Sequence, residues 1–426
     1  MRVLVIGSGA REHALAARFA AEPGVEMLLA APGNPGIARH ARCVPIDLAD
    51  VDAAAALAAR ERIDFTIVGP ELPLSRGLAD RFARDGRLLF GPTAAAARLE
   101  SSKAFAKAFM ARHGVPTARF RICDDAAAAL AAVRRDFSVP VVVKVDGLAA
   151  GKGVVIAEDV AAAEAAIVDA MRGRKFGSAG DCVVLEECLQ GPEVSFFAVC
   201  DGAKAVPLGT AQDHKRIFDA DRGPNTGGMG AFAPSPLVDA ALQQRIMRDI
   251  VDPVVAGMAA EGCPFRGFLY AGLMLTADGP KVIEFNVRLG DPEAQVVLPL
   301  VAEPLLPILA AAARGDLRQP AIALGRDRLV GVVMASRGYP DASESGRAIE
   351  GIEAAEAVPG VAVYHAGTAL RDGRLVTAGG RVLTVVGRGA DYPEAIARAY
   401  AGALQISFDG MQFRRDIGVK ALRIAD

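Results

Sequence analysis

The sequence predicts an α/β protein of several domains, α+β overall, and three observations lead to this fold class. The 426 residues are more than one hydrophobic core usually organises. Up to about residue 100, short apolar strands alternate with helical stretches, the pattern of a parallel sheet covered by helices. Strands dominate early in the range 191–325, and the last hundred residues indicate a smaller α+β unit.

The elements follow from apolar periodicity, taken along the chain. In the first part, the predicted strands are 2–6, 26–31, 65–70 and 88–92, and a helix pair follows up to Gly114. The middle part is predicted to hold two strands joined by a glycine-rich loop within 139–157, further strands at 182–189, 193–202, 204–213, 267–279 and 280–290, and helices at 160–173 and 303–315. The final part opens with an apolar strand near 328–335 and ends with a helical stretch after 394.

Composition excludes several classes of function. A net charge of −2 argues against nucleic acid as a main partner. No run of 18 apolar residues free of charge occurs, so we expect no membrane span, and the first apolar run is too short for a signal peptide. The six cysteines form no CxxC and the five histidines have no metal-ligand spacing, which predicts reduced thiols and no zinc site. We expect a cytoplasmic protein.

The stretch GSGAREHAL, residues 7–15, is a glycine-rich turn between a strand and a helix. Gly7 and Gly9 fit a dinucleotide fingerprint, but Glu12 takes the third glycine position and the second strand ends without an acid, which disfavours NAD. Free amides at a helix N-terminus suit a phosphate, and Arg11 could add a charged contact. A tight turn without a ligand is an equally good interpretation. Loops 31–36 and 68–77 lie at the same edge of the predicted sheet.

A second glycine-rich loop separates two predicted strands within residues 144–157. Gly147, Gly151 and Gly153 do not have Walker A spacing, and no Ser or Thr follows the lysine of the loop. A hairpin loop of this kind can cover phosphates with its amides. Lys144 lies in an apolar strand, where it either faces a phosphate or occupies a solvated strand edge.

The segment KVIEFNVRLGDPEAQ, residues 281–295, carries the most chemical information. Period-two geometry places Glu284, Asn286 and Arg288 on one face, and Ile283 with two other apolar residues on the buried face. Hard oxygen ligands suit Mg²⁺, and the guanidinium could hold an anionic substrate group. The alternative is a half-exposed strand stabilised by charge pairing.

A long loop, residues 211–236, combines Asp213, Lys215 and the glycine-rich run 226–230. Long loops in compact domains are usually functional. We expect His214, between the two charged residues, to be structural.

Together these segments resemble the phosphoribosylamine–glycine ligase (glycinamide ribonucleotide synthetase) family of ATP-grasp enzymes. The matching motifs run the whole chain, from GSGAREHAL through ESSKAFAK, KVDGLAAGKGV, AQDHKR, GPNTGGMGA and VIEFNVRLGDPEAQ to GMQFRRDIG. The resemblance implies a Rossmann-like domain at 1–101, an ATP-grasp domain at 102–325 with a lid at about 119–190, and a C-terminal α+β domain at 326–426.

The resemblance also implies roles for single residues. ATP would be bound by Lys103, Lys144, Gly147, Gly151, Gly153, Glu186, Glu187, Leu189 and Glu193. Glu284 and Asn286 would bind Mg²⁺ or Mn²⁺, and Asp213, Lys215 and Arg288 would be catalytic. The substrate site would comprise Gly9, Arg11, Glu12, Asn34, Glu71, Arg288, Gly290 and Asp291, with the first glycine loop holding the 5-phosphate of phosphoribosylamine.

The implied reaction joins glycine to phosphoribosylamine through glycyl phosphate, in a monomer or weak homodimer. Two alternatives stay open: an ATP-grasp ligase or carboxylase that uses another acid, and a nucleotide-binding protein without turnover. Ala10 departs from the family, which usually has glycine there. Its methyl group would crowd the phosphate unless it faces away, so we expect tuned affinity rather than lost activity.

Overall fold

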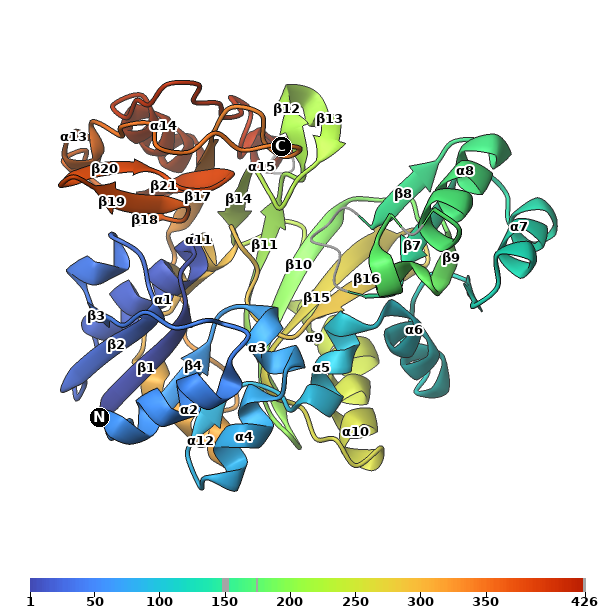
Figure 1. Cartoon of the computed structure of the whole chain (residues 1–426), viewed down its shortest axis with the longest axis horizontal. Helices are drawn as coiled ribbons and strands as arrows, with labels where there is room; N and C mark the ends of the chain where they lie inside the picture. The colour runs from blue at the N-terminus through green and yellow to red at the C-terminus, as the bar shows by residue number, and fades with distance from the viewer. Residues whose placement is uncertain (148–152, 174, 424–426) are drawn as a thin grey trace.

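The computed structural model describes residues 1–147, 153–173 and 175–423. Gly151, one of the predicted ATP-binding residues, lies outside these ranges. Figure 1 shows four groups of elements: an N-terminal sheet with its helices, a small sheet that projects to one side, a long central sheet, and a C-terminal layer.

The N-terminal group is a five-stranded parallel sheet in the order β3-β2-β1-β4-β5. Its central strand is buried along almost its whole length, as expected for a strand covered by helices on both faces. The parallel sheet is as predicted, and β3 is an additional strand. The elements are β1 (Arg2–Gly7), α1 (Ala10–Ala20), β2 (Met27–Pro32), η1 (Ile37–Arg39), β3 (Arg42–Cys43), α2 (Val51–Arg60), β4 (Phe65–Val68), α3 (Glu71–Ser75), α4 (Leu78–Arg84) and β5 (Leu89–Phe90).

The next group is a four-stranded antiparallel sheet with its own small core. Two helices lead into it and separate at Ser102, whose hydroxyl accepts the Phe105 N–H (3.1 Å) and caps the second helix. The sheet and its two covering helices project to the right in Figure 1 and fall within the range expected for a lid. The elements are α5 (Ala94–Ser101), α6 (Lys103–Arg112), β6 (Phe120–Cys123), α7 (Ala126–Arg135), β7 (Val141–Val145), β8 (Val154–Ala157), α8 (Val160–Met171), η2 (Gly177–Gly180) and β9 (Val183–Glu187).

The largest sheet has eight antiparallel strands in the order β16-β15-β10-β11-β14-β17-β21-β18. Along β10 the faces alternate: Phe196 packs with α9 and α10, and Phe197 packs with α12 on the other side. The central elements are β10 (Glu193–Asp201), β11 (Ala205–Asp213), β12 (Arg216–Phe218), η3 (Asp219–Asp221), β13 (Arg222–Asn225), β14 (Gly230–Ala233), α9 (Ala240–Ile246), η4 (Met247–Val251), α10 (Asp252–Ala260), β15 (Arg266–Thr276), β16 (Gly279–Asn286), α11 (Ala294–Val297), η5 (Leu298–Leu300) and α12 (Leu305–Arg314).

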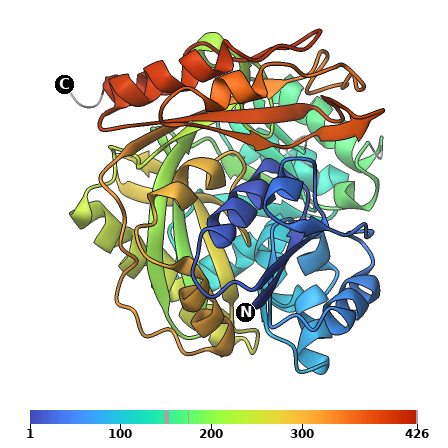
Figure 2. The same cartoon turned by 90° about the vertical axis from the view of Figure 1, so that its left-hand side faces the viewer.

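The C-terminal layer continues this same sheet. Strand β14 pairs with β17 from Gly230↔Val332 to Ala233↔Leu329, so the sheet runs without a break across the boundary expected near residue 325. Figure 2 shows the C-terminal elements lying across the N-terminal and central elements. They are β17 (Arg328–Ala335), α13 (Ile352–Glu356), β18 (Val361–His365), β19 (Thr368–Arg371), β20 (Arg374–Thr377), β21 (Arg381–Gly389), α14 (Tyr392–Ala403) and α15 (Val419–Leu422). In the described ranges, no helix has the length and apolarity that a membrane span requires.

Candidate active site

The first glycine loop is shaped around the side chain of Glu12. Its carboxylate accepts the Gly9 N–H (2.5 Å) and the Arg11 Nε–H (2.6 Å), and only 2% of the residue is exposed. A Cβ atom on Gly7 or Gly69 would collide with this side chain, so both positions require glycine. Glu12 therefore caps α1 and fixes the loop, whereas the resemblance implied that it lies near the substrate sugar.

Asn34 ties this loop to two other parts of the chain. Its Nδ2 donates to the backbone oxygens of Ser8 (2.8 Å) and His365 (2.8 Å), and its Oδ1 accepts the Ile37 N–H (2.8 Å). The side-chain amide is thus occupied by the protein, and the geometry favours positioning the loop over direct substrate contact. Ala10 is completely buried in the hydrophobic core beneath the helix, so its methyl group faces away from the loop.

Arg288 is held between two carboxylates that come from different parts of the chain. Its NH2 lies 2.9 Å from Glu100 Oε1, and its Nε lies 3.3 Å from Glu71 Oε2 at the start of α3. Glu100 also accepts the Val287 N–H (2.8 Å). Burial would lower the pKa of Arg288, but Glu100 and Glu71 outweigh it and raise the pKa. Sequence reasoning missed Glu100, although it opens the ESSKAFAK motif.

Strand β16 contains a bulge at Ile283, so the expectation that Ile283 lies on the buried face is wrong. Glu284 pairs with Gly272 and Val282 pairs with Leu273, which leaves Ile283 without a partner. Ile283 is therefore only half-buried, and Val282 takes the fully buried position that we expected for it. Phe285 and Val287 are buried as expected, and Glu284, Asn286 and Arg288 share the other face.

The bulge frees a carbonyl that binds a lysine of the lid. The freed Ile283 carbonyl accepts a hydrogen bond from Lys144 Nζ (3.1 Å), which also lies 2.9 Å from Glu186. Lys107 Nζ, from α6, lies 2.7 Å from the other oxygen of Glu186, and all three charged residues are at most 5% exposed. The solvated-edge interpretation of Lys144 is wrong. Burial is the main cause that lowers the pKa of Lys107, to about 8, against the opposing charge of Glu186.

Most of the other predicted ATP-binding residues lie on α6 and on or beside the strands of the lid sheet. Lys103, at the start of α6, donates to the Gly147 carbonyl (3.1 Å), and Glu187 accepts the Arg119 N–H (2.9 Å). Leu189 is half-buried just after β9, and Gly153 is buried just before β8.

Asp213 and Lys215 stand at the end of β11, beside the start of β10. Lys215 Nζ lies 3.0 Å from Glu193 Oε2. Burial raises the pKa of Asp213, with Lys215 opposing this shift. The positive charges of Lys215, Lys144 and Lys103 overcome burial and lower the pKa of Glu284, which keeps that carboxylate ionised.

A buried acid that sequence reasoning missed lies next to these residues. Glu293 accepts a hydrogen bond from Ser195 Oγ (3.1 Å) and is 4% exposed. Burial and the negative charge of Asp213 raise its pKa to about 7. A Cβ atom on Gly290 would lie 2.4 Å from the Glu293 carboxylate, so this glycine permits the close approach. The only sequence signal was the short polar turn after Gly290.

The face of β16 fits a divalent cation that shares its ligands with a phosphate. Glu284 offers an ionised carboxylate and Asn286 an amide oxygen, two residues apart on one strand face. Mg²⁺ and Mn²⁺ accept such a partial set and complete it with water and phosphate oxygens. Among the residues that the model describes, no three His, Cys, Asp or Glu side chains gather as a metal cluster.

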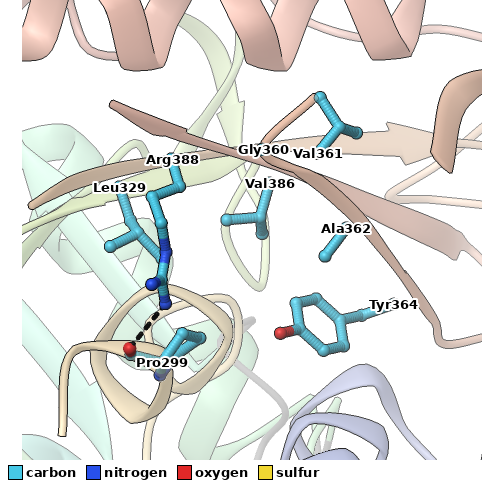
Figure 3. Close-up of a pocket in the computed structure, with 8 residues that line it drawn as sticks. All are labelled: Pro299, Leu329, Gly360, Val361, Ala362, Tyr364, Val386 and Arg388. Atoms are coloured by element: carbon cyan, nitrogen blue, oxygen red, sulfur yellow. Dashed lines mark hydrogen bonds between the residues drawn. The ribbon is translucent and has the colours of Figure 1, made fainter. Parts of the chain in front are cut away.

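A cavity of about 240 Å³ lies elsewhere, between the C-terminal strands and η5 (Figure 3). Arg388 crosses it and donates to the Pro299 carbonyl (2.7 Å). None of the predicted site residues lines it. The lining residues are Pro299, Leu329, Gly360, Val361, Ala362, Tyr364, Val386 and Arg388.

Comparison with known proteins agrees with this arrangement. Family models of phosphoribosylglycinamide synthetase match the N domain at residues 1–100, the ATP-grasp (A) domain at 101–294 and the C domain at 329–420. The chain belongs to the phosphoribosylglycinamide synthetase family. The resemblance inferred from the motifs and the α/β fold class with an ATP-grasp domain are therefore confirmed.

Relatives within this family match over almost the whole chain. The phosphoribosylamine–glycine ligase of Xylella fastidiosa (strain Temecula1) is 50% identical, with 99% of this chain and 98% of the relative aligned. That of Ralstonia nicotianae is 49% identical, with 99% and 100% aligned. The crystal structure of phosphoribosylamine–glycine ligase from Thermotoga maritima is 35% identical, with a TM-score of 0.86 over 98% of this chain and all of that one. A biotin carboxylase from Campylobacter jejuni, 17% identical with a TM-score of 0.74 over 100% of this chain and 95% of that one, shares the fold alone.

Proposed function

We propose that this protein is an ATP-dependent ligase that joins glycine to 5-phosphoribosylamine and releases ADP and phosphate. The observation that carries the proposal is the row Glu284, Asn286 and Arg288. Its Glu284 feels the charges of Lys215, Lys144 and Lys103, and the contact of Arg288 with Glu71 joins the row to the N-terminal sheet and its loops. The full-length relatives named phosphoribosylamine–glycine ligase support the same activity.

The first step in this proposal is phosphoryl transfer. A glycine carboxylate oxygen attacks the γ-phosphorus of ATP, the bond to the β-phosphate oxygen breaks, and ADP leaves. Such a step needs positioning and charge neutralisation more than a nucleophilic side chain. Lys103 and Lys144 supply positive charge from the lid side. Mg²⁺ or Mn²⁺, held by Glu284 and Asn286, would supply further neutralisation of the phosphates.

Lys144 keeps one N–H donor for this role. Its other two face Glu186 and the Ile283 carbonyl, and Glu186 compensates the charge of Lys144 only in part because it is shared with Lys107. A third acceptor, a phosphate oxygen, matches the three N–H donors of an ammonium group. Lys107 keeps Glu186 compensated when Lys144 turns toward the nucleotide.

The second step is acyl transfer. The amine of phosphoribosylamine attacks the acyl carbon of glycyl phosphate, phosphate leaves with the electrons of the C–O bond, and the amine loses one proton. Arg288 stabilises the negative charge that develops, because its planar guanidinium is fixed by Glu71 and Glu100 before the substrates arrive. The lid excludes water, which would otherwise hydrolyse the acyl phosphate.

ADP release tests the proposal directly. The purified chain is supplied with Mg²⁺, ATP and glycine, with and without phosphoribosylamine formed in situ from ribose 5-phosphate and ammonia. We expect release that needs both substrates and at least a hundredfold lower turnover for Arg288→Lys, which keeps the charge but not the planar fork. The variant Arg248→Lys, on an exposed helix, is the matched control.

Other outcomes separate the alternatives. Release with formate or bicarbonate in place of glycine would keep the ATP-grasp fold and discard glycine as the acid substrate. Binding of ATP without release for any acid would leave a nucleotide-binding protein without turnover. Full turnover by Arg288→Lys would contradict the role given to the guanidinium. Size-exclusion chromatography of the same sample tests whether the protein is a monomer or weak homodimer.

A further inference from the structure

Arg381, the first residue of β21, reaches from the C-terminal layer into the centre of the molecule. Its NH1 donates to the backbone oxygens of Gly227 (2.7 Å) and Asp291 (2.6 Å), and its NH2 lies 3.3 Å from Asp291 Oδ2. One guanidinium thus holds two segments that are 64 residues apart in the sequence. Neither composition nor motif spacing singled out this arginine.

Asp291 lies where three parts of the chain meet. Its Oδ1 accepts a hydrogen bond from Gln295 Nε2 (2.8 Å), and its Oδ2 lies beside the first glycine loop, 3.6 Å from where a Cβ atom on Gly9 would be. Burial would raise the pKa of Asp291, but Arg381 and then Arg11 outweigh it and lower the pKa. The carboxylate is therefore kept ionised chiefly by a charge from the C-terminal layer.

The turn at Gly227 and Gly228 is fixed by the same layer. Tyr339 Oη accepts the Gly227 N–H (2.9 Å). Gly228 has a positive φ of 116°, and a Cβ atom there would lie 2.5 Å from Pro292 Cδ. The turn therefore packs directly on Pro292. Arg381 binds the residue next to each partner of this contact, Gly227 on one side and Asp291 on the other.

We propose that Arg381 is a positioning residue for the ligase reaction. It fixes Asp291 and the Gly227–Gly228 turn against the first glycine loop, so the C-terminal domain sets the geometry of the phosphoribosylamine side of the active site. This rests on the proposed function. Only the planar fork of arginine can reach two carbonyls and a carboxylate at once, so lysine can restore the charge but not the geometry.

The chain offers a matched control on the same strand. Arg388 also lies on β21, also donates to a backbone carbonyl of the central elements, and also pairs with an aspartate, Asp327 at 3.3 Å. It lines the remote cavity of Figure 3 and contacts no predicted site residue. Arg388→Met therefore removes an equivalent link between the layers and leaves Asp291 untouched.

The test compares Arg381→Met, Arg381→Lys and Arg388→Met with the wild type by ADP release. For Arg381→Met we expect kcat/KM for phosphoribosylamine to fall at least thirtyfold, with KM for ATP within twofold. The acid limb of kcat/KM against pH should move to higher pH, because Asp291 loses the charge that lowers its pKa while Arg11, Arg288 and the nearby Glu12 remain. Arg381→Lys should keep the limb near its wild-type position and recover only part of the rate.

Hydrogen exchange keeps this proposal separate from the proposed function. Amide exchange at residues 226–230 and 290–291 should increase in Arg381→Met and not in Arg388→Met, whatever reaction the wild type catalyses. If the wild type shows no ligase activity but this exchange difference is present, the proposed function fails. The proposal that Arg381 fixes Asp291 and the Gly227–Gly228 turn is then supported independently of the reaction. If Arg381→Met matched Arg388→Met in both exchange and kinetics, the positioning role of Arg381 would be wrong.

Discussion

Replacing Asn34 tests whether the first glycine loop is held by the protein or by the substrate. Asn34→Ala removes three hydrogen bonds, two to the carbonyls of Ser8 and His365 and one from the Ile37 amide. At about 1 kcal/mol for each buried hydrogen bond, the free energy of unfolding should fall by about 3 kcal/mol. Total stabilities are about 5–15 kcal/mol, so the variant should fold but unfold at a clearly lower urea concentration.

Asn34→Asp sharpens the test because it keeps the shape of the side chain. One oxygen still accepts the Ile37 N–H, but the other replaces a donor and faces two carbonyl oxygens. We expect a loss of about 3 kcal/mol or more, because two hydrogen bonds disappear and a repulsion is added. Gln405→Ala, which removes an exposed amide, is the control and should change stability by less than about 0.5 kcal/mol.

The assay combines urea unfolding with ADP release at varied phosphoribosylamine. Both Asn34 variants should lose stability and lose kcat/KM for phosphoribosylamine, while KM for ATP stays within twofold. An Asn34→Ala variant that keeps its full unfolding free energy but binds phosphoribosylamine weakly would refute the reasoning. It would show that the side chain contacts the substrate, as the family resemblance implied.

Three further predictions rest on buried groups. Ala10→Gly should lower the unfolding free energy by about 1–2 kcal/mol, from one buried methyl group and glycine's extra backbone entropy, without changing KM for phosphoribosylamine; a severalfold lower KM would mean that the methyl group crowds the loop. Lys107→Met should weaken equilibrium ATP binding about tenfold, because Glu186 loses one of its two cations and competes for Lys144; unchanged ATP binding in a folded variant would contradict this role. Burial raises the pKa of Glu293 to about 7, above its ordinary 4.5, so the folded state holds an extra proton between these values and wild-type stability should fall by an amount on the order of 3 kcal/mol as pH rises from 4.5 through 7. Urea unfolding at a series of pH values should show no such decline for Glu293→Gln, and parallel curves for the two proteins would exclude this assignment.

Local periodicity predicted the elements that build the site. The alternation of strands and helices gave a parallel N-terminal sheet whose loops gather at one edge, and the strand at 281–288 presents Glu284, Asn286 and Arg288 on one face. These features depend on residues a few positions apart, and short-range patterns report them directly.

The residues that sequence reasoning missed act through contacts between distant segments. Glu100 reaches Arg288 across 188 positions, and Arg381 reaches Gly227 across 154. The bulge at Ile283 depends on the register with β15, which an apolar pattern in one strand does not contain. The continuity of the large sheet across residue 325 has the same origin, because the pairing of β14 with β17 joins segments about a hundred residues apart.

The eight-stranded sheet, which the central and C-terminal elements share, determines how this protein unfolds. Because β14 and β17 form one ladder, the central and C-terminal elements should unfold in one cooperative transition, and removing the C-terminal part would leave β14 as an unpaired apolar edge. The lid sheet has its own core and no strand in that ladder, so its opening breaks few of these contacts. The fold thus separates a continuous frame, which carries Glu284, Asn286 and Arg288, from a smaller sheet that is joined to it by side-chain contacts such as that of Lys144 with the Ile283 carbonyl.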